Sequence, residues 1–156
     1  SVFQKGAGAV VIAGILVAIC AGTFSDWVFK GRRAPMAFWG YATQVICLAV
    51  IWRAPSVNAV IAAFVFNSFA ISIVHSMLSG TASMDFGGKK AAATAAGLFD
   101  GMQYIGGSAV GLGMGWLLEK YGWGAWGPSM IGFSLIGSLL MLLLWNARPQ
   151  TKVSGH

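Results

Sequence analysis

Long apolar runs separated by short polar segments dominate the chain. Runs of this length can cross a bilayer as helices, because a helix rises about 1.5 Å per residue and the hydrocarbon core is about 30 Å thick. The pattern predicts five membrane spans, at residues 6–24, 35–52, 57–80, 91–118 and 128–145. Turns connect them at 25–34, 53–56 and 119–127, and a loop at 81–90 connects the third span to the fourth. The polar tail 147–156 is expected to be disordered. The predicted fold is therefore all-α and integral to the membrane, with one transmembrane bundle over residues 1–146.

The fourth span carries a polar face. Asp100 is the single formal charge between Lys90 and Trp116. A carboxylate near the bilayer centre costs about 2.5–3.5 kcal/mol, so it faces protein or water rather than lipid. Gln103 and Tyr104 follow at i+3 and i+4 and share its face. We expect this face to line a substrate pathway, and a purely structural hydrogen bond of Asp100 is the alternative.

Glycines recur along the same span at helical spacing. Gly97 and Gly101 are four residues apart, as are Gly107 and Gly111. Small residues at this spacing let membrane helices approach one another closely. We expect these four glycines to lie in helix-packing contacts.

The third span has a second polar stripe. It consists of Ser68, Ser72, His75, Ser76 and Ser79, with Asn67 beside it. We expect the stripe to face a cavity, with Ser72, His75 and Asn67 on the substrate pathway. Serine hydroxyls also bond to carbonyls of their own helix, which is the alternative. A role of His75 as proton carrier or substrate ligand stays open.

Composition and charge agree with a membrane protein. Of 156 residues, 57% are hydrophobic and 9% are charged, against about a quarter charged in soluble domains. The net charge of +6 comes from short basic clusters between apolar runs, which set topology rather than bind nucleic acid. One side of the predicted bundle carries Lys30, Arg32, Arg33, Lys89, Lys90, Arg148 and Lys152, and the other carries Lys5, Arg53 and Lys120. This bias predicts a cytoplasmic C-terminus and an N-terminus outside.

Several chemistries find no support in the sequence. Cys20 and Cys47 lie inside apolar runs without partners at metal-ligand spacing, so neither a metal site nor a disulfide is expected. No nucleophile–base pair, zinc-protease motif or phosphate-binding loop is present. We therefore expect no enzyme activity and no cofactor.

The turn after the first span has a specific pattern. It reads GTFSDWVFKGRR and contains Gly22, Asp26, Gly31, Arg32 and Arg33. It resembles the Gly-x-x-x-Asp…Gly-Arg-Arg loop of the major facilitator superfamily. The spacing from Asp26 to Gly31 is longer than in the usual form of this loop. This longer form looks like that of the organophosphate:phosphate antiporter branch, which includes glycerol-3-phosphate and hexose-phosphate transporters.

A second segment is similar to the same branch. KKAAATAAG at 89–97, followed by YIGG at 104–107, looks like its eleventh helix. By this resemblance the chain corresponds to the eighth to twelfth helices, part of the C-terminal six-helix half. The resemblance implies a partner for the chain, the missing N-terminal half of the transporter.

The resemblance also implies a function. Such proteins sit in the inner membrane and exchange a small phosphorylated substrate for inorganic phosphate by alternating access. The five residues of the turn would act as a conformational latch, and the third and fourth spans would line the cavity. The arginines that hold the phosphate belong to helices outside this chain. Simple anchoring by Lys30, Arg32 and Arg33 is the alternative for the basic turn.

Two further functions stay open. A membrane sensor of sugar phosphate could use the same fold, and sequence does not separate it from a transporter. A non-transporting subunit of a membrane complex is a third possibility, although a static bundle has no need of a latch.

Overall fold

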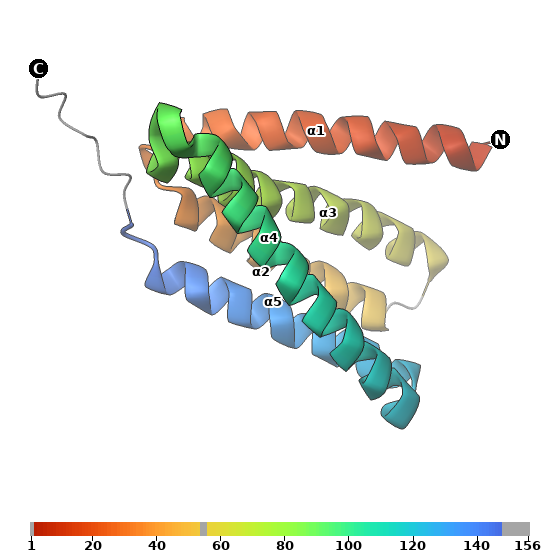
Figure 1. The fold of residues 1–156 in the computed structure, drawn as a ribbon. Coiled ribbons are helices and arrows are strands. Elements are labelled where there is room, and N and C mark those ends of the chain that lie inside the picture. The colour runs from red at the N-terminus through yellow and green to blue at the C-terminus, as the bar shows by residue number, and fades with distance from the viewer. Residues whose placement is uncertain (1, 54–55, 148–156) are drawn as a thin grey trace, which may run out of the picture.

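The structure is a computed structural model that describes residues 2–53 and 56–147 (Figure 1). Within these residues it contains five α-helices: α1 (Val2–Phe29), α2 (Arg33–Arg53), α3 (Val57–His75), α4 (Ala82–Tyr121) and α5 (Trp126–Leu143). A π-helical turn, η1 (Ser76–Thr81), follows α3, and a short 3₁₀ helix, η2 (Trp123–Ala125), precedes α5. The described residues contain no strand, so the predicted all-α fold is confirmed.

Four of the helical segments have the length and hydropathy of membrane spans. They cover Ile12–Phe29, Arg33–Arg53, Val57–Gly80 and Trp123–Leu143. Within the described residues α4 is not among them, because Asp100, Gln103 and its many glycines lower its hydropathy. As positions in a bilayer, the five spans stay predictions. The predicted disordered tail lies outside the described residues, apart from Ala147.

The turn between α1 and α2 is tight. Lys30 and Gly31 have φ angles of 53° and 78°, in the left-handed region that glycine adopts without a Cβ clash. The backbone amide of Arg32 then donates to the Phe29 carbonyl at 3.1 Å. Pro35 follows in the first turn of α2, where its missing N–H costs nothing.

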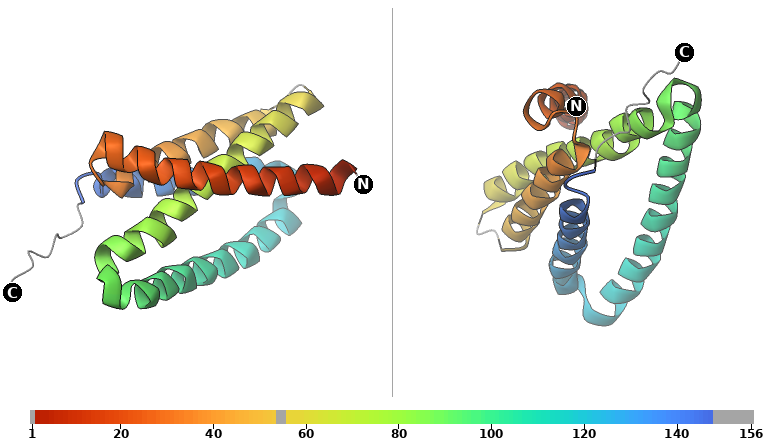
Figure 2. Two further views of the ribbon diagram at one scale, coloured as in Figure 1. Left: turned by 90° about the horizontal axis from the view of Figure 1, so that it is seen from above. Right: turned by 90° about the vertical axis from the view of Figure 1, so that its left-hand side faces the viewer.

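The prediction of a loop at 81–90 is wrong, because this stretch is helical and belongs to η1 and α4. The chain does reverse direction near the start of α4, which appears as the sharp green corner in Figure 2. This stretch contains Gly87 and Gly88, and adjacent small residues are a common cause of helix kinks. Glycines and charges therefore mark a bend in a helix here, and not a break in it.

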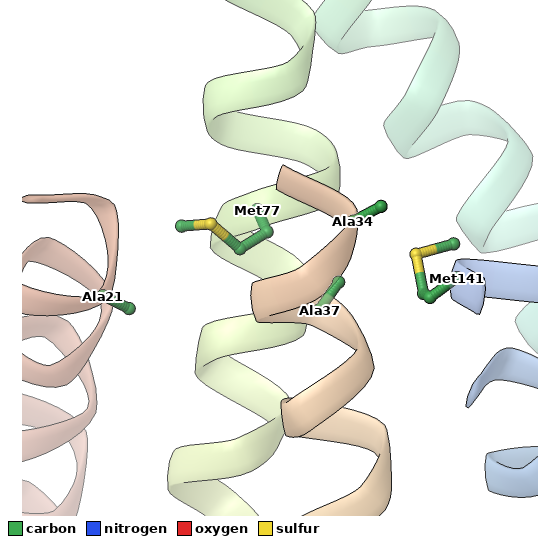
Figure 3. Close-up of a cluster of buried hydrophobic side chains, with 5 residues drawn as sticks. All are labelled: Ala21, Ala34, Ala37, Met77 and Met141. Carbon is green, nitrogen blue, oxygen red and sulfur yellow. The ribbon is translucent and has the colours of Figure 1, made fainter. Parts of the chain in front are cut away.

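Helix α2 is the centre of the bundle and packs against both α3 and α5. Glycines permit these approaches. A Cβ on Gly40 would lie 2.6 Å from Val74 Cγ2, and one on Gly137 would lie 2.6 Å from the Tyr41 ring. A small core joins α1, α2, η1 and α5 near the α1–α2 turn (Figure 3); it consists of Ala21, Ala34, Ala37, Met77 and Met141.

Helix α4 packs differently from the others. Its main contacts are with η1 near one end and with η2 at the other. Seen from the side in Figure 2, it leans away from α1, α2 and α3 and approaches α5 at its far end. A long face of α4 is consequently open within the described chain.

Candidate functional site

Four polar side chains form a connected network between the α3–η1 segment and α4. Ser79 Oγ donates to Asp100 Oδ1 at 2.6 Å, and Gln103 Nε2 donates to Ser79 Oγ. His75 Nδ1 lies 3.1 Å from Gln103 Oε1. The reversal of the chain at the start of α4 brings these residues together, although His75 and Gln103 are 28 positions apart. We call these four residues the polar network.

A second cluster lies near the α1–α2 turn. Arg33 Nη1 lies 2.6 Å from Asp26 Oδ1, and Arg33 Nε donates to Asp85 Oδ2 at 2.8 Å. These contacts join the end of α1, the start of α2 and the start of α4. The Arg33 side chain is 14% exposed, whereas Asp85 is 22% and Asp26 is 59% exposed. We call Asp26, Arg33 and Asp85 the arginine cluster.

The other members of the predicted latch have local roles. Arg32 Nε donates to the Phe29 carbonyl at 3.3 Å, at the C-terminal end of α1. Ser25, which is fully buried, donates to the Arg32 carbonyl at 3.2 Å. Gly31 supplies the positive φ of the turn, and a Cβ at Gly22 would meet no atom within 4 Å.

Two cavities lie beside the polar network and share Tyr41, Gln44 and Ile71. The larger, of about 450 Å³, is lined in part by Asn67, whose buried Oδ1 has no hydrogen-bond partner in the described part of the chain. The smaller, of about 310 Å³, is lined in part by His75 and Gln103. Neither cavity is lined by an Asp, Glu, Lys or Arg side chain of the described residues.

The remaining predicted pathway residues lie elsewhere. Tyr104 is 79% exposed, so the described part of the chain covers little of its side chain. Ser72 donates to the Ser68 carbonyl of its own helix at 3.0 Å, and its hydroxyl lies against Gly14 of α1. Ser68 likewise donates to the Phe64 carbonyl. For these two serines the structure therefore shows the alternative given above, in which the hydroxyl bonds to a carbonyl of its own helix.

The four predicted packing glycines of α4 have open surroundings. A Cβ added to Gly97, Gly101, Gly107 or Gly111 would meet no atom within 4 Å. The close approaches are made by glycines in α1, α2 and α5 instead. A packing role for the α4 glycines therefore requires a neighbour outside the described residues and stays a prediction.

Sequence reasoning missed two residues of these clusters as site candidates. Asp85 pairs with Arg33 from 52 positions away, and no local spacing links the two. Ser79 belonged to the serine stripe, but nothing in the stripe distinguished it from Ser72. Among the described residues, no three His, Cys, Asp or Glu side chains could together hold a metal ion.

Comparison with known proteins identifies relatives. The chain is 35% identical over 136 residues to the glycerol-3-phosphate transporter of Bacillus subtilis, which covers 86% of this chain. It is 28% identical to a probable hexose phosphate transport protein of Chlamydia trachomatis and 28% identical to the membrane sensor protein UhpC of Escherichia coli, over 90% and 88% of this chain. The chain spans 31% of the length of each of these relatives. No protein-family model and no solved structure matches it.

The fold and the apolar helices define a multi-pass α-helical membrane protein. The relatives then place the chain more closely: it is homologous to a part of these transporters and of the sensor, which is consistent with the resemblance of the turn and the α4 segment to the organophosphate:phosphate antiporters. The relatives named here are transporters or a sensor, and none is an enzyme.

Proposed function

We propose that the chain is part of a secondary transporter that exchanges an organophosphate for inorganic phosphate by alternating access. The organophosphate would be a sugar phosphate, a glycerol phosphate or a phosphoglycerate. The observation that carries this proposal is the arginine cluster, which joins three helix ends through ion pairs. A static bundle gains little from such partly exposed charges, whereas a moving one can break and reform them.

The arginine cluster can act as a latch because its contacts are moderate in strength. A hydrogen bond to a charged group is worth about 1.5–3 kcal/mol where solvent is excluded, and an exposed ion pair such as that with Asp26 less than about 1 kcal/mol. Contacts of this size can bias a two-state equilibrium without locking it. In one conformation Arg33 would hold Asp26 and Asp85 together, and in the other it would release at least one of them.

The polar network and the adjoining cavities would form part of the substrate path. Asp100 is a carboxylate and repels phosphate, so its contact would be with the organic part of the substrate. The chain has no arginine between Arg53 and Arg148, which agrees with phosphate ligands on helices of the missing N-terminal half and the seventh helix. Tyr104, Ser72 and Asn67 remain proposed pathway residues.

The proposed setting is the inner membrane, with the N-terminus of the chain outside and its C-terminus in the cytoplasm. The distribution of Lys and Arg supports this orientation. The latch would then lie on the cytoplasmic side. No cofactor, metal or nucleic acid enters the proposed cycle.

A reconstitution experiment tests the proposed exchange. The complete protein would be placed in proteoliposomes loaded with inorganic phosphate and supplied outside with labelled glycerol 3-phosphate, hexose 6-phosphate or phosphoglycerate. We expect uptake of at least one of these, dependent on internal phosphate. Uptake that is equal in vesicles without internal phosphate would contradict exchange, and no uptake of any would contradict transport.

The similarity to a membrane sensor supports a second candidate function. A sensor would bind sugar phosphate on the same fold and signal to another protein without net flux. Saturable binding without transport in the same vesicles would favour the sensor. Neither binding nor transport would leave the non-transporting subunit as the remaining candidate.

A further inference from the structure

The hydroxyl of Ser79 lies in the middle of the polar network, between Asp100 and Gln103. Its side chain is buried, with 6% of its surface exposed, and it contacts both Asp100 and Gln103 of α4. It lies in the π-helical turn η1. π-Helical turns are rare and frequently occur at functional sites. The turn therefore presents a buried hydroxyl to α4, with which α3 itself makes few contacts.

The hydrogen bonds of the network have one consistent direction. Ser79 donates its single proton to Asp100 and therefore accepts from the amide nitrogen of Gln103. The amide oxygen of Gln103 then faces His75, so Nδ1 of His75 is the donor. The hydrogen bonds therefore run from His75 through Gln103 and Ser79 to Asp100, and the orientation of the Gln103 amide follows from Ser79.

This arrangement occupies only part of Asp100. An ionised carboxylate has two acceptor oxygens, and Ser79 uses Oδ1. Among the residues whose side chains the structure describes, none donates a hydrogen bond to Oδ2. Such an oxygen can accept a substrate hydroxyl, but it repels a phosphate group.

We propose that Ser79 is a positioning residue, which orients Asp100 and Gln103 so that Asp100 accepts a hydroxyl from the organic part of the substrate. This inference rests on the proposed exchange function. It assigns the network to the hydroxyl-bearing end of an organophosphate and predicts that inorganic phosphate, which lacks this end, does not depend on Ser79.

The experiment compares two exchanges catalysed by the same protein. The complete protein in proteoliposomes would exchange internal phosphate either for external labelled phosphate or for the organophosphate that the wild-type protein takes up, whether glycerol 3-phosphate, hexose 6-phosphate or phosphoglycerate. For Ser79→Ala we expect about a tenfold rise in the KM for this organophosphate, with the KM for phosphate changed less than twofold. Ser79→Thr keeps the hydroxyl, so we expect the KM for the organophosphate in this variant to lie close to the wild-type value.

Ser83→Ala is the matched control. Ser83 is also buried, with 2% exposed, but its hydroxyl donates to the backbone carbonyl of Gly80, three residues earlier, and not to a side chain of the polar network. We expect both exchanges of this variant to stay near wild type. If Ser79→Ala does not insert, Ser79→Cys, which weakens the hydrogen bonds but keeps the size, takes its place with the same expected shift.

The outcomes separate this inference from the function on which it rests. Equal loss of both exchanges in Ser79→Ala, without rescue by threonine, would show a purely structural role and overturn the inference. Unchanged KM values for both substrates would overturn it too. If the wild-type protein carries out neither exchange, the proposed function fails, and the substrate contact fails with it.

Discussion

Arg33 forms ion pairs with Asp26 and Asp85, and solvent weakens the two pairs to different extents. The carboxylate of Asp85 is 22% exposed, whereas that of Asp26 is 59% exposed. Solvent screens exposed ion pairs, and most contribute less than about 1 kcal/mol. The contact of Arg33 with Asp85 is therefore the stronger of the two, although the sequence drew attention to Asp26.

This difference gives a prediction for the latch. Asp26→Asn should slow conformational exchange while substrate affinity stays within a few fold. Asp85→Asn should slow it more, because the better-shielded contact is lost. Rates of substrate counterflow in proteoliposomes would measure both effects. An unchanged rate in both variants would reduce the turn to a membrane anchor.

Asp100 carries a prediction about substrate choice. Asp100→Asn keeps the size of the side chain and removes its charge and one acceptor oxygen. We expect the variant to insert normally, but to lose roughly tenfold in transport efficiency or to alter its preference among organophosphates, as loss of a charged hydrogen bond would do. Competition between labelled and unlabelled substrates would measure this. Wild-type kinetics for every substrate would exclude a role in the cavity.

How far the sequence predicts a single residue depends on the range of its contacts. Asp100 and Gln103 were found because helical spacing places them on one face, and they do lie together. Ser72 and Ser79 both belong to the stripe of the third span, but only Ser72 was predicted to lie on the substrate pathway. Ser72 lies against α1, while Ser79, in the π-helical turn, contacts α4. Hydropathy patterns contain no information on a π-helical turn or on the helix that each serine meets.

At the scale of helices, the sequence predicted the apolar elements well and their contacts poorly. Apolar length was sufficient to indicate the helices, because an isolated apolar run has few other stable states in a membrane. Which glycines permit close approach depends on the facing side chain. Gly127 lies against Trp52, and neither residue gives a sign of this in its local pattern.

The contact of α2 with α5 gives a prediction about stability. A Cβ on Gly127 would lie 2.5 Å from Trp52 Cγ, close to the backbone, where the ring cannot simply rotate away. Gly127→Ala should therefore destabilise the chain by about 1–3 kcal/mol. Gly132→Ala, in the same helix with no atom within 4 Å of the new Cβ, should be neutral or slightly stabilising. Thermal unfolding in detergent would compare them, and equal midpoints would contradict the packing.

At the scale of the whole molecule, α4 is the least enclosed helix. A Cβ at any of its four predicted packing glycines would meet no atom of the described residues within 4 Å, yet glycine is among the poorest helix formers. Glycines that permit close packing lower the stability of a helix unless a neighbour fills the space. The chain spans about a third of the length of the relatives it matches, and we expect the filling neighbour to be a helix outside the described residues.

The last prediction tests this neighbour. Gly111→Leu places a large side chain on the open face of α4, where the described chain has room for it. We expect the thermal stability of the isolated chain to change little, whereas the complete protein should lose most of its exchange activity, because close helix contacts do not accommodate leucine. Gly113→Leu, equally open but on a different side of the helix, is the control. If both variants retain wild-type exchange in the complete protein, the face borders lipid, and the glycines of α4 have no packing partner. If both variants lose it equally, the effect does not depend on the predicted face.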